Sequence, residues 1–190
     1  MRLLIDVDGV LAEFTYGFTK LATELGLVEK PWRCHTQKTW AFDFDVDAVW
    51  EELKRRYNWW MTLEPLVDVV EIAVLNELIK AHDVYFVTSR PRTQGLSAEK
   101  QTEYWLAGIG IHTAGASVIA TKTGTKGALA KALDINLGWD DHLGNLEDLT
   151  RADILAVSRP WRYNEAWWGI QASSVHSFNG IVELSQEEIT

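Results

Sequence analysis

RLLIDVDGV, residues 2–10, is the stretch that decides the fold of this 190-residue chain. It opens with a short apolar run, typical of a strand that is covered on both faces. Two aspartates follow at positions 6 and 8, and Gly9 lets the backbone turn sharply away from the strand. Because residues i and i+2 of an extended strand point to the same side, Asp6 and Asp8 can address one ligand.

Short apolar runs alternate with helical segments along the rest of the chain. This alternation predicts an α/β fold, with a Rossmann-like parallel sheet core sandwiched by helices. The strands are expected at Arg2–Val7, Asp83–Thr88, Ala116–Ala120, Ile135–Trp139 and Ala152–Val157. The helices between them are expected at Leu66–Lys80, Ser97–Ala107, Lys126–Leu133 and Leu143–Thr150. A last strand near Val175–Phe178 and a short helix are expected in the tail.

One stretch directly after the first strand interrupts the alternation. It holds two helix-like segments, Phe14–Leu25 and Val46–Tyr57, joined by a loop with many aromatic residues. We therefore predict a small helical cap over residues 15–63, inserted into a core made of residues 1–14 and 64–190.

Composition limits the classes of partner. The chain carries 18 basic and 27 acidic residues, a net charge of −9, and the run 54–56 is its one short basic cluster, so no stable nucleic-acid partner is expected. No segment approaches the roughly 20 apolar residues that cross a bilayer, so no membrane partner is expected either. The single cysteine, Cys34, cannot form an intramolecular disulfide, and without a signal-peptide pattern this indicates a cytoplasmic protein. The oligomeric state stays open, and a homodimer is compatible with the sequence.

Polar side chains gather where the predicted strands end. Thr88-Ser89-Arg90 follows the second strand and Asp140-Asp141 follows the fourth, while Lys126 opens the helix before the fourth strand. The carboxyl ends of parallel strands lie along one edge of a sheet, where open α/β folds bind their ligands. These clusters and Asp6-Val7-Asp8 therefore predict one shared site.

The residue types in this predicted site suit phosphoryl transfer. Asp6 can attack phosphorus as a nucleophile, and Asp8 can protonate the leaving oxygen and later activate water. Acids this close together repel one another unless a hard cation lies among them, so Mg²⁺ is expected as the cofactor, with Asp6, Asp8, Asp140 and Asp141 as its candidate ligands. Lys126 would neutralise charge on the phosphoryl oxygens. The hydroxyl groups after the second strand would bind the phosphate.

These segments resemble the motifs of haloacid-dehalogenase-like phosphatases. Asp6-Val7-Asp8-Gly9-Val10-Leu11-Ala12 is similar to the first motif, more narrowly to that of the 5′(3′)-deoxyribonucleotidases, also called cytosolic type C 5′-nucleotidases. The return from cap to core at residues 59–66 and the late segment Arg159-Pro160-Trp161 with Asn164 are similar too. The resemblance implies a Mg²⁺-dependent phosphomonoesterase that hydrolyses (deoxy)nucleoside 5′-monophosphates, small-molecule substrates, through an aspartyl-phosphate.

The resemblance also implies roles for particular residues. Thr88 and Ser89 would hold the phosphate, and the Asp8 carbonyl would bind the metal. Trp59 and Trp60 would form a wall for the nucleobase, with a packed cap core as the alternative. Arg90 departs from the family, which has proline directly after the Thr-Ser pair; it would add a phosphate contact or pair with a surface acid.

The sequence leaves two residue assignments and the choice among related functions open. Lys122 is an alternative to Lys126 as the lysine of the third motif. One or both of Asp140 and Asp141 would bind the metal, directly or through water, and the sequence does not say which. Other readings are a related phosphatase for another small phosphorylated metabolite or a nucleic-acid 3′ end, and a non-catalytic domain that senses nucleotide. A receiver-type phosphorylation domain is disfavoured, because it needs an aspartate at the end of the third strand, where this chain has Ala120-Thr121.

Overall fold

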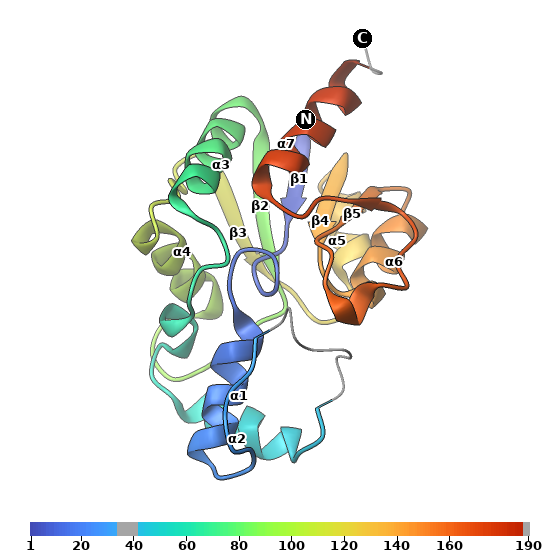
Figure 1. Cartoon of the computed structure of the whole chain (residues 1–190). Helices are drawn as coiled ribbons and strands as arrows, with labels where there is room; N and C mark the ends of the chain where they lie inside the picture. The colour runs from blue at the N-terminus through green and yellow to red at the C-terminus, as the bar shows by residue number, and fades with distance from the viewer. Residues whose placement is uncertain (34–41, 188–190) are drawn as a thin grey trace.

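The computed structural model describes residues 1–33 and 42–187, and its centre is a six-stranded sheet (Figure 1). The strand order is β3-β2-β1-β4-β5-β6, and every neighbouring pair is parallel. This is the strand order of doubly wound, Rossmann-like sheets, so the predicted fold class is confirmed. The strands are β1 (Arg2–Ile5), β2 (Asp83–Thr88), β3 (Ala116–Ala120), β4 (Leu137–Asp140), β5 (Leu155–Ser158) and β6 (Ile170–Gln171). The segment with Cys34 lies outside the described residues.

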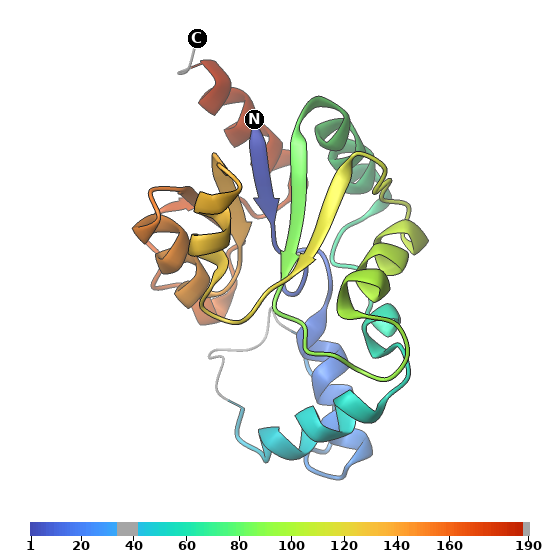
Figure 2. The same cartoon turned by 180° about the vertical axis from the view of Figure 1, so that it is seen from behind.

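Helices cover both faces of the sheet (Figures 1 and 2). Side chains alternate between the two faces of β1: Leu3 and Ile5 join one hydrophobic core and Leu4 the other. The first core receives apolar side chains from α3 (Val69–Ala81), α4 (Ala98–Gly108) and α7 (Val175–Glu187). The second receives them from α5 (Lys126–Ala132) and α6 (Leu143–Arg151). Since β1 is buried on both faces, its near-continuous apolar sequence is explained.

The tail differs from its prediction. The strand expected near Val175–Phe178 is wrong, because this segment begins helix α7. Val175, Phe178 and Val182 are all buried, at a spacing that puts them on one helix face, and the Phe178 ring stacks on Trp139 with centroids 4.7 Å apart. A short apolar run does not distinguish a strand from a buried helix, which accounts for the error. The last strand is β6, ahead of this helix.

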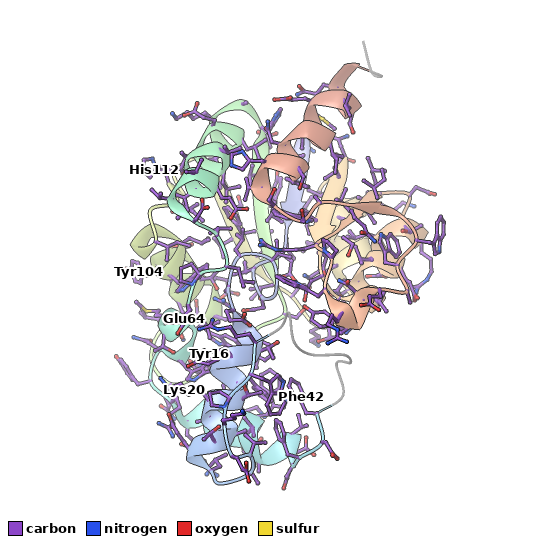
Figure 3. The ribbon with its side chains drawn as sticks, viewed as in Figure 1. Tyr16, Lys20, Phe42, Glu64, Tyr104 and His112 are labelled. Atoms are coloured by element: carbon purple, nitrogen blue, oxygen red, sulfur yellow. The ribbon has the colours of Figure 1, made fainter. Side chains whose placement is uncertain are left out.

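Helices α1 (Phe14–Glu24) and α2 (Val46–Arg55) lie together beyond the carboxyl ends of the strands (Figure 1). Their shared core is aromatic: the Phe18 ring lies 4.8 Å from Trp50 and 5.2 Å from Phe42, which Figure 3 shows beside these helices. The 3₁₀ helix η2 (Trp59–Thr62) then leads back to the sheet.

The outgoing and returning chains run side by side at the base of this helical segment. Ala12 and Pro65 form an antiparallel bridge, and the Glu13 amide donates to the Glu64 carbonyl at 2.9 Å. The two segments that connect the sheet to helices α1 and α2 therefore pair with each other, next to the end of β1. The division into a core and a cap at residues 15–63 stays a prediction.

Candidate active site

Asp6 lies at the carboxyl end of β1, almost completely buried. Its amide donates to the Trp139 carbonyl, which continues the β1–β4 pairing by one residue. One carboxylate oxygen, Oδ1, accepts hydrogen bonds from the Val7 amide at 2.7 Å and pairs with the Lys126 ammonium at 2.8 Å. The chain then turns back at once, because the Leu11 and Ala12 amides both donate to the Val7 carbonyl. The turn fixes Asp6 at the sheet edge.

Lys126 is buried between two acids. Its Nζ lies 2.8 Å from Asp6 and 2.6 Å from Asp140. Burial alone would lower the Lys126 pKa, but Asp140 and Asp6 outweigh it and raise this pKa above its usual range. Lys126 therefore stays an ammonium and joins β1, β4 and α5 at one point. Lys122, its competitor for the third motif, is exposed in the loop before α5.

Asp140 has little capacity left for a further ligand. Its Oδ1 accepts from the His142 amide at 2.9 Å and from the Asn145 side chain at 3.1 Å. Its Oδ2 accepts from Lys126 at 2.6 Å and also lies 3.2 Å from the Asn145 amide nitrogen. Since a carboxylate has about four acceptor positions, this carboxylate is saturated by protein donors.

Asp141 is arranged differently. Its Oδ2 accepts a hydrogen bond from the Tyr163 hydroxyl at 2.5 Å, and its backbone carbonyl accepts one from Asn164 at 2.7 Å. The carboxylate approaches Gly9 so closely that an added Cβ on that residue would lie 2.1 Å from Asp141 Oδ2. Gly9 also has φ +80°, a conformation that glycine adopts without strain. The glycine is therefore needed for both the turn and the space.

The acids at this edge suit a hard divalent cation. Oxygen atoms of Asp6, Asp140 and Asp141 lie within 4.8 Å of one another, and all three residues are buried. Burial, then the neighbouring Asp140, raises the Asp6 pKa to about 7, although Lys126 acts in the opposite direction. Burial, then the neighbouring Asp6 and Asp140, raises the Asp141 pKa well above its usual value. A cation would reverse both shifts, and carboxylate oxygens are ligands that suit Mg²⁺. With Asp140 saturated, Asp6 and Asp141 are the carboxylates with room to bind it.

The residues after β2 divide into two groups. Thr88 donates its hydroxyl to Asp8 Oδ2 at 2.9 Å, and Arg90 donates to the same carboxylate. The hydroxyl of Ser89 is buried and has no hydrogen-bond partner among the described residues. Since an unpaired buried hydroxyl is costly, Ser89 is the donor in this segment that is available to a phosphate oxygen.

A cavity of about 200 Å³ opens over these groups. Its floor includes Asp6, Asp8 and Asp141, and its wall on the helical side is formed by Phe14, Trp50 and Trp60. Phe14 stacks on both tryptophans, with centroids 5.7 Å from Trp50 and 6.1 Å from Trp60. Six polar side chains complete the lining: Thr88, Ser89, Arg90, Thr123, His142 and Asn145.

Trp59 and Trp60, the tryptophans predicted to form a wall for the nucleobase, border two different cavities. Trp60 lines the cavity, and its indole N–H donates to the Pro91 carbonyl at 2.9 Å. Trp59 is packed edge-on against Trp60 and borders a separate groove with Tyr16 and Lys20, two residues labelled in Figure 3. Of the pair, only Trp60 is in a position to meet a ligand in the cavity.

No family model matches the sequence, and no curated protein matches it. Solved structures do match: a haloacid dehalogenase-like hydrolase, SP0104, from Streptococcus pneumoniae has a TM-score of 0.58 at 10% identity, covering 96% of this chain and 97% of that one. The β-phosphoglucomutase of Clostridium difficile has a TM-score of 0.55 at 16% identity, covering 99% and 98%.

The fold is that of haloacid dehalogenase-like hydrolases. CbbY from Rhodobacter sphaeroides, solved in complex with phosphate, shares it with a TM-score of 0.53 at 15% identity, covering 92% of this chain and 94% of that one. At such identities the likeness concerns the fold. In this haloacid-dehalogenase fold, all the strand-end residues predicted from the sequence come together at one edge of the sheet.

Four residues around the site were missed by sequence reasoning. Phe14 and Trp50 lie in helices whose apolar faces read as ordinary core, and Asn145 and Tyr163 reach the acids from α6 and from η3 (Arg162–Asn164). Asn145 lies in the first turn of α6 and donates to Asp140, so its place just after the acidic pair could have signalled a role at the site. Nothing in the sequence indicated that Tyr163 contacts the acids, apart from its position next to Asn164.

Among residues 1–33 and 42–187, no helix is both long enough and apolar enough to cross a membrane.

Proposed function

We propose that this protein is a Mg²⁺-dependent phosphomonoesterase that hydrolyses (deoxy)nucleoside 5′-monophosphates to nucleosides and phosphate. One observation carries the proposal: Asp6 lies on the floor of a cavity, between a buried ammonium and two more carboxylates, and the opposite wall is aromatic. The floor suits a phosphate with its metal, and the wall suits a flat, uncharged leaving group.

The residues supply each part of a double displacement. An Asp6 oxygen attacks phosphorus as the bond to the leaving oxygen breaks, and protonated Asp8 gives that oxygen its proton. Asp8, now a carboxylate, takes a proton from water as the water oxygen attacks the aspartyl-phosphate, which releases phosphate and restores Asp6. Ser89 donates to a phosphoryl oxygen, and Lys126 neutralises negative charge beside the nucleophile.

Mg²⁺, held by Asp6, Asp141 and the Asp8 carbonyl, would supply charge neutralisation for the phosphate and for the buried acids. The raised Asp6 pKa agrees with a cation at this place, because a nearby cation would favour the ionised form of a carboxyl that is otherwise partly protonated near neutral pH.

The substrate side of the proposal rests on the aromatic wall. Stacking on a nucleobase contributes about 1–3 kcal/mol of binding free energy per base and needs a ring face that borders the cavity. Phe14, Trp50 and Trp60 all border it. No lysine borders this cavity, and Arg90, its one arginine, is paired with Asp8, among the parts of the chain that the structure describes. A substrate with one phosphate and a neutral remainder fits this lining better than a bisphosphate does.

The test is phosphate release from ribo- and deoxyribonucleoside monophosphates and from sugar phosphates, with Mg²⁺ or with EDTA. Asp6→Asn should abolish release, whereas Asp153→Asn, at an exposed aspartate with positive φ that asparagine tolerates, should leave it unchanged. Mass spectrometry of acid-quenched enzyme should find one phosphate on Asp6.

Each alternative predicts a different outcome. Release from sugar phosphates alone would keep the chemistry and exclude the nucleotidase. Activity on nucleic-acid 3′ phosphates alone would likewise keep the phosphatase chemistry and exclude the nucleotidase. Nucleotide binding without any turnover, and with no phosphate on Asp6, would favour a nucleotide-sensing domain.

A further inference from the structure

Arg90 makes a buried, two-point ion pair with Asp8. Its Nε donates to Asp8 Oδ2 at 2.9 Å and its Nη2 donates to Asp8 Oδ1 at 2.9 Å. The Arg90 side chain has 0% of its surface exposed, whereas that of Asp8 has 18%. The arginine therefore approaches Asp8 from the protein interior, and the carboxylate faces the cavity.

The guanidinium is itself held from several sides. Its Nη1 donates to the Thr102 hydroxyl of α4 at 2.8 Å, and it lies over the Trp60 ring, 4.9 Å from the ring centroid, and near Trp105 at 5.8 Å. A planar guanidinium fixed in this way has one orientation available. It connects Asp8 to the wall of the cavity through Trp60.

The hydrogen bonds leave Asp8 with one free acceptor position. Of about four positions on a carboxylate, Oδ2 uses two, for Arg90 and for the Thr88 hydroxyl, and Oδ1 uses one. The remaining position is on Oδ1. A proton that passes between Asp8 and a group in the cavity must then pass through this oxygen.

We propose that Arg90 is a positioning residue, which fixes the plane of the Asp8 carboxyl so that Oδ1 is aimed at the leaving oxygen and later at water. The inference rests on the proposed function, since it takes Asp8 as the acid and base. It differs from the phosphate contact that the sequence left open for Arg90, because the guanidinium has no exposed surface and its Nε, Nη1 and Nη2 atoms each donate to a protein oxygen.

The test exploits the leaving group. p-Nitrophenolate departs without a proton, whereas the alkoxide of a nucleoside or of glycerol needs one, so an aimed Asp8 matters for the second kind of substrate. Single-turnover release of the leaving group is measured for p-nitrophenyl phosphate and for an alkyl phosphate, in the wild type and in Asp8→Asn, Arg90→Lys and Thr102→Val. Arg90→Lys keeps the charge but cannot hold both carboxylate oxygens.

We expect Arg90→Lys to slow release from the alkyl phosphate about 100-fold while release from p-nitrophenyl phosphate changes less than about 5-fold, with KM little altered. Thr102→Val removes one of the hydrogen bonds that hold Arg90 without touching Asp8, so it should slow release from the alkyl phosphate less than Arg90→Lys does and leave release from p-nitrophenyl phosphate unchanged. For Arg90→Ala, added methylguanidine should restore part of the alkyl phosphate rate and not the p-nitrophenyl phosphate rate.

Three results would overturn the inference. Equal losses on both substrates in Arg90→Lys would show a purely structural pair, and a rise in KM alone would show a phosphate contact. If Asp8→Asn shows no dependence on the leaving group, the acid–base role of Asp8 fails and the inference fails with it. If the rate loss depends on the leaving group in Asp8→Asn but not in Arg90→Lys, the proposed function stands and only the inference about Arg90 is lost.

Discussion

The hydroxyl of Tyr163 donates a 2.5 Å hydrogen bond to Oδ2 of Asp141. The two residues are 22 positions apart, and Tyr163 is buried in η3. The neighbouring Asn164 side chain donates to the Asp141 backbone carbonyl. The segment after β5 therefore holds Asp141 by both its side chain and its backbone, and Oδ1 is the oxygen that would bind a metal in the proposed site.

Tyr163→Phe should weaken Mg²⁺ binding about 10-fold, because partners that orient a metal ligand typically contribute 10–100-fold to affinity. The ring stays, so packing is kept and only the hydrogen bond is lost. Isothermal titration calorimetry with Mg²⁺ measures the effect without any substrate. Tyr104→Phe, at an exposed tyrosine of α4, is the control and should bind Mg²⁺ like the wild type. Equal affinities for all three proteins would show that Asp141 needs no such support.

Substitution of Asp140, the last residue of β4, and of Asp141, which follows it, should have different effects. Asp141→Asn removes a carboxylate that has an open oxygen, so it should weaken Mg²⁺ binding strongly. Asp140→Asn instead removes the acceptor that lies 2.6 Å from the Lys126 ammonium, so it should lower kcat by about 100-fold with a smaller change in Mg²⁺ affinity. Titrating activity against Mg²⁺ separates the two parameters. If Asp140→Asn weakens Mg²⁺ binding more than Asp141→Asn does, then Asp140 and not Asp141 is the direct metal ligand.

Sequence reasoning predicted the sheet edge well because the α/β alternation implies parallel strands, and the carboxyl ends of parallel strands lie along one edge. It could not predict contacts that depend on the exact approach of distant segments. Arg90 and Asp8 are 82 positions apart, and nothing in the chain next to Arg90 announces its partner. Trp50 reads as the apolar face of a helix, and whether such a ring borders a cavity depends on packing that periodicity does not encode.

Removal of Mg²⁺ should make stability depend on pH in a particular direction. The folded-state pKa of Asp6 is about 7, above its unfolded value of 3.8, so the folded protein binds more protons between these values. Stability then falls as pH rises through this window, and the loss reaches a few kcal/mol, since one pKa unit corresponds to about 1.4 kcal/mol. Because Mg²⁺ binds the ionised acids, it should stabilise the protein more at pH 7.5 than at pH 5.

Asp6→Asn checks the assignment of this pH dependence. In EDTA at pH 7.5 the variant should unfold at higher urea concentration than the wild type, because a neutral side chain replaces a buried carboxylate. At pH 4.5, where the wild-type Asp6 is protonated in the folded state, the difference should shrink. A variant that is less stable at both pH values would mean that the pair with Lys126 outweighs the burial of the charge.

The aromatic wall gives the most direct test of substrate class. Trp50 borders the cavity and stacks on Phe14, so Trp50→Leu should raise KM for a nucleoside monophosphate about 10-fold, the equivalent of about 1.4 kcal/mol of stacking. KM for p-nitrophenyl phosphate or glycerol phosphate should change less, because the phosphate contacts come from the opposite side. Trp168→Leu is a matched control, since that ring is 89% exposed and lies outside the cavity lining. If Trp50→Leu raises KM equally for nucleotide and glycerol phosphate, the wall only shapes the cavity and the nucleobase has no place against it.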